Sequence, residues 1–253
     1  MRFLASVDGR VVDASELRHD EPYVMQRIHT LGGCAYAVER HLQLLRDASE
    51  ELFGFAPLLD VATTEGVISR LLRESFAPAQ FSLPIQLRIG CRGEHIFIVE
   101  RPTFGAGAYL RAKRIDIAPV ICHMSHGVCP TSVSVAHDAM LDRSSHIAGG
   151  DCALPINDDG YLVSRPWLPI FVVAGNKVYT PAAHHSVEYT IATEAIAAAG
   201  FSLVVVPIPL SLLDRADELL YIDIMGISAC AKIGDHRLFF SAATRIAAKM
   251  QPK

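Results

Sequence analysis

Asn157–Pro181, with the sequence NDDGYLVSRPWLPIFVVAGNKVYTP, is the stretch that decides the fold. It opens with a polar turn, continues into the apolar run Ile170–Ala174, turns at Gly175-Asn176 and returns to Thr180-Pro181. Two β-forming runs joined by a short turn of glycine and asparagine are typical of a β-hairpin. We therefore predict a hairpin here, preceded by an irregular polar segment.

The composition is that of a chain with a large core. The 253 residues are 51% hydrophobic and 20% charged, which argues against disorder and suits two modest domains or one large one. A formal net charge of −4 gives no electrostatic reason to expect nucleic acid or a membrane surface as a partner. Without a signal-peptide pattern or a long apolar run, we expect a cytoplasmic protein with reduced thiols.

The first part of the chain is rich in strands and contains two helices, an α+β layer pattern rather than strict βαβ alternation. Apolar residues recur at helical spacing over Val38–Phe53, and Gly54 follows as a helix-ending glycine. A second helix is predicted over 64–76, with Thr63 or Thr64 as its N-cap. Strands are predicted at 1–7, 11–12, 23–29, 34–37, 84–91, 96–99 and 109–120. The first domain is expected to span residues 1–118.

The second domain is expected to span residues 119–253. A helix is predicted from Thr131 or Ser132 to Asp142, and an alanine-rich helix over Val187–Ala199 is closed by Gly200. A last helix is predicted over 242–249. Strands are predicted at 152–156, 170–174, 177–180, 203–208, 219–224, 230–233 and 237–240.

Several short sequence blocks, each different from the others, occur along the chain in a recognisable order. His41–Leu45 (HLQLL) lies in the first helix, Asp159–Tyr161 (DGY) and Ile170-Phe171 lie in the opening stretch, Val178–Pro181 (VYTP) ends it, and Ala216–Leu219 (ADEL) precedes the last strands. Their order and spacing resemble those of the fold-type-IV pyridoxal-phosphate enzymes, which include branched-chain and D-amino-acid aminotransferases and aminodeoxychorismate lyase.

The resemblance implies a smaller N-terminal α/β domain and a larger C-terminal domain of barrel-like β-structure with helices, with the ligand in a cleft between them. It also implies pyridoxal phosphate as the cofactor, aminotransferase or lyase chemistry on a small metabolite, and a homodimer.

In the related enzymes certain residues contact the ring of the cofactor. At the matching positions of this chain other residue types are found. A lysine must form the Schiff base, yet the matching window Ser125–Ser132 (SHGVCPTS) contains none, and Lys113 lies too early in the order. Ser164 stands where a carboxylate faces the pyridine nitrogen, and Pro169 stands where an asparagine precedes Ile170.

The residues that hold the cofactor's phosphate are replaced as well. Leu44 takes the place of an arginine, and Ser186–Tyr189 (SVEY) takes the place of a Gly-Ile-Thr-Arg helix start, with Tyr189 at the arginine and an acid at Glu188. Asp223–Gly226 (DIMG) replaces a threonine-rich turn, with Ile224 among the substitutes. An unneutralised phosphate in a partly buried cleft is costly. We therefore predict that pyridoxal phosphate is not bound.

Other reactive side chains stand near the missing lysine. His123, His126 and Cys129 recur at intervals of three, which admits a metal site, a cysteine–histidine nucleophile pair, or an irregular linker whose histidines bond to local backbone. The spacing matches no standard zinc pattern, so we predict no metal and favour the linker. His126 and Cys129 are the candidate catalytic residues here, because an imidazole titrates near neutrality, and His123 is a candidate substrate contact.

Three further residues complete the candidates. Arg165 is a candidate for a substrate carboxylate or a solvated loop residue, and Trp167 is a candidate for stacking on an aromatic ligand or for anchoring the core. Asp223 lies in an apolar strand and is a candidate catalytic acid. His184-His185 precedes the alanine-rich helix, where it could help to hold an anion, but we favour a loop pair near the helix cap. His137-Asp138 is predicted to be a pair on a helix surface.

Three functions are consistent with these residues. The first is a protein that binds or converts a small metabolite without the cofactor. The second is an active pyridoxal-phosphate-dependent aminotransferase or aminodeoxychorismate-lyase-like enzyme with a displaced lysine. The third is a non-catalytic subunit that pairs with an active paralogue. Whether the protein is an enzyme stays open at this point.

Overall fold

A computed structural model describes residues 3–17, 21–78, 81–101, 104–105, 109–111, 113–123, 127 and 129–250. These residues form two compact units, the first within 1–107 and 128–133 and the second within 108–127 and 134–251. None of the helices in these ranges is long and apolar enough to cross a membrane.

The first unit is built on an antiparallel sheet with the strand order β2-β1-β6-β5-β3-β4, and β7 pairs with β5. Its strands are β1 (Leu4–Val7), β2 (Arg10–Asp13), β3 (Tyr23–Leu31), β4 (Cys34–Ala35), β5 (Phe81–Gly90), β6 (His95–Val99) and β7 (Phe104–Gly105), with a short 3-10 helix at Ala14–Glu16. The two long central strands, β3 and β5, pair over most of their length and are almost wholly buried along their apolar positions.

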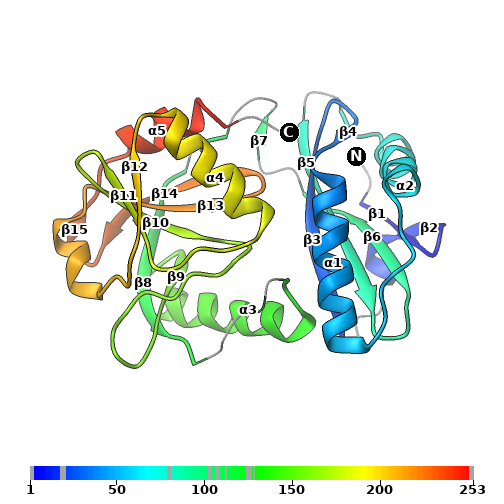
Figure 1. Cartoon of the computed structure of the whole chain (residues 1–253), viewed down its shortest axis with the longest axis horizontal. Coiled ribbons are helices and arrows are strands. Elements are labelled where there is room, and N and C mark those ends of the chain that lie inside the picture. Colours follow the sequence, from blue (N-terminus) through cyan, green and yellow to red (C-terminus); the bar gives the residue numbers. More distant parts are fainter. Residues whose placement is uncertain are drawn as a thin grey trace. The chain divides into compact units, whose positions relative to one another are not determined.

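Two helices cover this sheet. Helix α1 (Val38–Phe53) has the bounds that the sequence predicted, and Gly54 ends it in the left-handed conformation at φ 78°. Helix α2 (Val61–Glu74) begins earlier than predicted, because the Asp60 carboxylate accepts a hydrogen bond from the Thr63 amide at 2.7 Å. The predicted threonine cap is therefore wrong. Helix α1 packs on β3, α2 packs on β1 and β6, and the two helices contact each other (Figure 1).

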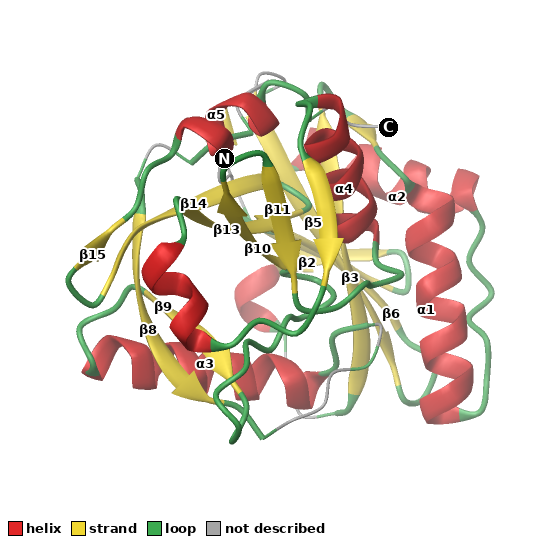
Figure 2. Ribbon diagram, turned by 60° about the vertical axis from the view of Figure 1, so that its left-hand side comes forward, coloured by secondary structure: helices red, strands yellow, loops and turns green. Residues whose placement is uncertain are grey.

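The second unit is built on a mixed sheet with the strand order β12-β11-β10-β13-β14-β8-β9, and β15 pairs with β14. Its strands are β8 (Ile115–Ile121), β9 (Cys152–Ile156), β10 (Ile170–Ala174), β11 (Lys177–Thr180), β12 (Ser202–Val205), β13 (Glu218–Asp223), β14 (Gly226–Ile233) and β15 (His236–Arg237). Figure 2 shows the central strands of this sheet, with α4 beside them.

The hairpin predicted from the opening stretch is confirmed as β10 and β11, which turn at Gly175. Along β10, Phe171 and Val173 pack in one apolar cluster, and Ile170 and Val172 pack in a second. Because successive side chains of a strand point to opposite faces, both faces of this strand are covered. That explains why its sequence is continuously apolar rather than alternating.

Three helices and a 3-10 segment complete the second unit. They are α3 (Ser132–Ile147), which starts in the returning segment of the first unit, α4 (Val187–Ala198), α5 (Ser241–Ala247) and the 3-10 helix η2 (Leu210–Arg215). The buried carboxylate of Glu218 caps the first turn of α5, where it accepts hydrogen bonds from the amides of Ala242 and Ala243 at 2.6 and 2.9 Å. Helices α4 and α5 pack over β13.

Candidate functional site

The loop 164–169, which leads into β10, is fixed by one acid on helix α3. Arg165, only 2% exposed, places its guanidinium 2.9 Å from the Asp138 carboxylate, and the Trp167 indole donates to the same carboxylate at 3.0 Å. Burial acts against the charge of Arg165, but the charge of Asp138, its hydrogen bond, and the nearby Tyr221 and Cys152 together outweigh burial, and the pKa of Arg165 is raised. The prediction of a surface role for Asp138 is therefore wrong, since its side chain turns toward the buried loop.

A second set of polar groups surrounds Arg165. The Asp142 carboxylate accepts from the Ala153 amide at 3.1 Å and from the Cys152 thiol at 3.6 Å. Burial raises the pKa of Cys152 to about 11, so this thiol stays protonated and is a poor nucleophile. Two guanidinium nitrogens of Arg165, Nε and Nη2, have no hydrogen-bond partner among the described residues.

Ser164, at the start of the same loop, forms a contact with a histidine that precedes α4. Its hydroxyl accepts a hydrogen bond from the Ile170 amide at 3.2 Å and lies 3.0 Å from the His184 Nε2. The His184 ring meets the Tyr189 ring edge-on at 5.6 Å between centroids, and Tyr189 in turn stacks on Phe171 at 6.0 Å. The structure thus brings together two residues that the sequence treated separately.

The start of α4 is capped by the side chain of Ser186. The Ser186 hydroxyl accepts from the Tyr189 amide at 3.1 Å and donates to the Pro166 carbonyl at 2.5 Å, which ties the helix to the loop 164–169. Glu188, in the first turn, is only 3% exposed. Burial raises the pKa of Tyr189, whose phenol is therefore neutral. An acid near the positive end of a helix dipole is favourable for the helix.

Asp223 lies at the end of β13, where it holds a turn. Its carboxylate is ion-paired with Arg111 and accepts a hydrogen bond from the Met225 amide at 2.8 Å. Ile224 and Met225 are each 3% exposed, so this turn presents apolar side chains to the core. The candidate catalytic acid is thus engaged within the second unit.

The structure does not bring the predicted histidine and cysteine candidates into one described cluster. His123 lies 3.2 Å from Asp158 on an exposed surface of the second unit, whereas Cys129 is buried in the first unit. His126 lies outside the described residues. No group of three or more histidine, cysteine or acidic side chains in the described ranges is placed to hold a metal ion.

Cys129 belongs to a buried chain of hydrogen bonds that no sequence pattern predicts. Its thiol accepts from the Gln26 amide at 3.1 Å and donates to the Leu44 carbonyl at 3.2 Å, and the other end of Gln26 lies 2.7 Å from the His41 Nδ1. Burial, and then the charge of Arg40, lowers the pKa of His41 to about 3. The imidazole is therefore neutral.

Lysines in the described part of the chain all lie on the surface. Lys113, Lys177, Lys232 and Lys249 are exposed. The first of them, Lys113, pairs with the Asp151 carboxylate at 3.0 Å.

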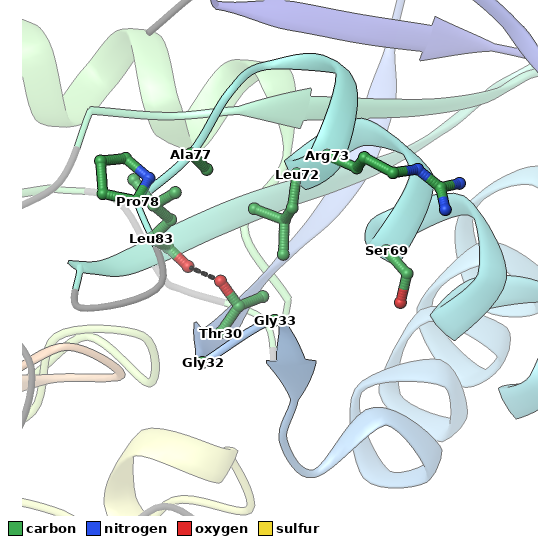
Figure 3. Close-up of a pocket in the computed structure, with 9 residues that line it drawn as sticks. All are labelled: Thr30, Gly32, Gly33, Ser69, Leu72, Arg73, Ala77, Pro78 and Leu83. Atoms are coloured by element: carbon green, nitrogen blue, oxygen red, sulfur yellow. Dashed lines mark hydrogen bonds between the residues drawn. The ribbon is translucent and has the colours of Figure 1, made fainter.

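A pocket of about 290 Å³ lies in the first unit (Figure 3). Its lining residues are Thr30, Gly32, Gly33, Ser69, Leu72, Arg73, Ala77, Pro78 and Leu83. The Thr30 hydroxyl is already committed to the Leu83 carbonyl at 2.8 Å, and none of the candidate site residues is in the lining. This pocket is therefore separate from the residues that the sequence singled out.

Solved structures of aminotransferases share this architecture. The branched-chain aminotransferase of Thermoproteus uzoniensis, solved with norvaline, matches at a TM-score of 0.77 and 16% identity over 98% of this chain and 93% of that one. An aminotransferase from Brucella abortus bound to PLP matches at 0.79 and 14% identity, with 98% of each chain covered. A hypothetical aminotransferase from Mycobacterium tuberculosis, with α-ketoglutarate and PMP bound, matches at 0.77 and 16% identity, again over 98% of each.

These likenesses concern the fold. No protein-family model matches the sequence, and no curated protein matches it. The resemblance that the sequence blocks indicated is confirmed at the level of architecture, including its mixture of helices and strands. This chain has the fold of the fold-type-IV aminotransferases.

Proposed function

We propose that this protein binds or converts a small metabolite without pyridoxal phosphate, at the surface of the second unit where Ser164, His184 and the start of α4 meet. We also expect it to act as a homodimer in the cytoplasm. The proposal is carried by one observation, the buried Glu188 carboxylate in the first turn of α4.

Glu188 and Ser186 do not fit a phosphate dianion. An anion binds at a helix start because free amides and the helix dipole favour negative charge there. Here an acid, Glu188, occupies the first turn and is buried, and the Ser186 hydroxyl already takes the Tyr189 amide at 3.1 Å. A site built for a phosphate dianion would place a cation or free amides at this position instead.

The exposed lysines support the same proposal. A Schiff-base lysine works when its amine is desolvated or placed beside a cation, so that its pKa falls. The lysines of the described ranges lie on the surface, and Lys113 is neutralised by Asp151 rather than activated by a cation. The metabolite would instead meet the Ser164–His184 pair and the ring of Tyr189.

Reduction with borohydride in the presence of pyridoxal phosphate tests this proposal. The purified protein is mixed with excess cofactor, its visible spectrum is recorded, and the reduced lysines are mapped by mass spectrometry. We expect no stable internal-aldimine band and only scattered, substoichiometric modification of exposed lysines. Variants Lys113→Ala and Lys177→Ala should behave alike, because neither lysine is a cofactor site.

Stoichiometric modification of a single lysine, lost in one variant only, would instead establish the pyridoxal-phosphate-dependent alternative. The fold is the observation that favours this alternative. Native mass spectrometry of the untreated protein would show the bound metabolite and the homodimer. A mixed dimer with a related chain would argue against both the cofactor-independent and the pyridoxal-phosphate-dependent function. It would indicate that this protein is a non-catalytic subunit.

A further inference from the structure

We propose that Ser164 and His184 form a nucleophile–base pair that transfers acyl groups from small carboxylic esters. The proposal rests on the proposed function, because it needs position 164 to be free of a cofactor. It starts from the 3.0 Å separation between the Ser164 hydroxyl and the His184 Nε2, which is within the range of a working nucleophile and its base.

The proposed reaction needs the Ser164 hydroxyl to donate its proton to His184. A serine hydroxyl has one proton and two lone pairs. The Ile170 amide donates to one lone pair at 3.2 Å, and the His184 Nε2 lies 3.0 Å from the hydroxyl, within reach of its proton. In this reactive form the second lone pair is the one that attacks. It requires the tautomer of His184 that carries its proton on Nδ1.

Ser164 is held in place from both sides. The Ile170 amide belongs to the first residue of β10, a buried strand. On the other side the adjacent Arg165 is locked to Asp138 at 2.9 Å, and the Ser186 hydroxyl holds Pro166. A reacting group fixed by packing and by secondary contacts loses little entropy on reaching the transition state. Ser164 nevertheless keeps 8% of its surface exposed.

The neighbouring rings indicate the kind of acyl group. His184 rests edge-on against Tyr189, which stacks on the fully buried Phe171. Burial raises the pKa of Tyr189 and keeps it neutral, so this side of the pair is uncharged and largely apolar. A short aliphatic or aromatic acyl group suits such a wall, whereas a charged one would lose its hydration there.

The reaction has two balanced halves. In the first, the Ser164 oxygen bonds to the ester carbonyl carbon, His184 Nε2 takes the hydroxyl proton, the carbon–oxygen bond to the alcohol breaks, and that proton passes to the leaving alcohol. In the second, water attacks the acyl-serine, and His184 takes the proton of the water and returns it to the Ser164 oxygen. The products are a carboxylic acid and an alcohol, and no oxidant or cofactor is consumed.

The test uses p-nitrophenyl acetate and diisopropyl fluorophosphate on the full-length protein, without added cofactor. We expect release of p-nitrophenol with a burst, and phosphorylation of Ser164 located by mass spectrometry. Ser164→Ala should abolish both, and His184→Gln should slow them by about a hundredfold or more, because general-base catalysis commonly contributes that much. His185→Ala, at the exposed neighbouring histidine, and Ser202→Ala, at an exposed serine, should match the unaltered protein.

A Ser164→Cys variant keeps the test decisive if removal of the hydroxyl destabilises the loop. Its thiol should react with iodoacetamide faster than the native cysteines, and this advantage should disappear with His184→Gln. Reaction at another serine, or equal rates with and without His184, would overturn the proposal. If the borohydride experiment finds no cofactor while Ser164 stays unlabelled, the acyl-transfer proposal alone fails. An aldimine on one lysine would remove the proposed function itself.

Discussion

Asp138 is the residue on which the loop 164–169 depends. Its carboxylate receives both the Arg165 guanidinium, at 2.9 Å, and the Trp167 indole, at 3.0 Å. Arg165 is almost fully buried, so its charge is tolerable only next to an opposite charge. The acid therefore stabilises the loop by neutralising a cation that has no access to water.

An Asp138→Asn substitution is expected to lower the free energy of unfolding by roughly 3 to 5 kcal/mol, the usual cost of leaving a buried charge unpaired. The emission of Trp167, the chain's only tryptophan, should shift to longer wavelength at the same time, because the loosened loop lets water reach the indole. Urea unfolding monitored by fluorescence measures both. Asp235→Asn, at an exposed turn, is the control. An unchanged midpoint for Asp138→Asn would contradict the role given to this acid.

The partners of these buried polar side chains could not be predicted from the sequence. The sequence blocks single out Ser164, Glu188 and Tyr189 as positions where cofactor contacts are replaced, and their role in a site stays a prediction. The partners of Ser164 and Arg165 come from segments 20 and 27 positions away, respectively, as the hydrogen-bond and ion-pair partners show. Such pairings depend on how helices and loops pack, and no local spacing encodes them.

At the scale of elements, the turn between β13 and β14 is a point where two stretches of backbone come very close. Gly226 has φ 131°, and a Cβ built there would lie 2.5 Å from the Tyr109 carbonyl oxygen, a backbone atom that cannot move aside. The neighbouring Ile227 amide donates to that same carbonyl at 2.8 Å. Glycine is therefore needed both for the backbone angle and for the close approach.

Gly226→Ala is expected to destabilise the protein by about 3 kcal/mol or more, since strain and a backbone clash act together. Gly66→Ala is the matched control, because Gly66 lies inside α2 with open space around it. That change should stabilise the protein by about 0.5 to 1 kcal/mol, through the better helix propensity of alanine. Thermal unfolding by calorimetry distinguishes the two. Equal and small effects would show that the turn at Gly226 is not constrained.

Elements marked by a glycine turn or by regularly spaced apolar residues were predicted with the right bounds. Helix α3, which buries polar side chains, was not. The hairpin, α1 and β9 matched because glycine turns and apolar periodicity are local signals. Helix α3 runs to Ile147, past the predicted end at Asp142. Its polar residues face the sheet, where the Asp142 carboxylate accepts from Ala153 and the Ser145 hydroxyl donates to the Cys152 carbonyl at 2.6 Å. A buried polar face hides the amphipathic pattern.

At the scale of the whole molecule, the two histidines whose pKa values are lowered most by burial weaken the fold in acid. Burial lowers the pKa of His41 to about 3 and that of His29 to about 4, against 6.5 for an unperturbed histidine. Above pH 6.5 both are neutral in the folded and the unfolded states, and they add nothing to the pH dependence. Below it the unfolded state takes up protons that the folded state refuses, so stability falls as the pH falls toward the folded pKa values.

The free energy of unfolding is therefore expected to drop by about 1.4 kcal/mol per pH unit for each histidine between pH 6.5 and 4. Urea titrations at a series of pH values measure the slope. The imidazole resonances of His29 and His41 in an NMR titration identify the source, and they should keep their neutral positions down to pH 5. Protonation of either ring near pH 6 would remove the explanation.

The segment 128–133 makes completion of the first unit depend on the order of synthesis. Thr131 bridges to Val24 at the edge of β3, the Pro130 carbonyl accepts from the Met25 amide, and Cys129 bonds to Gln26. Cys129, Pro130 and Thr131 leave the ribosome only after β8, a strand of the second unit, has been made. A nascent chain that ends before them exposes an unpaired strand edge, the feature by which unfinished chains aggregate. Translation speed between residues 107 and 133 is thus expected to govern how much of this protein reaches its native state.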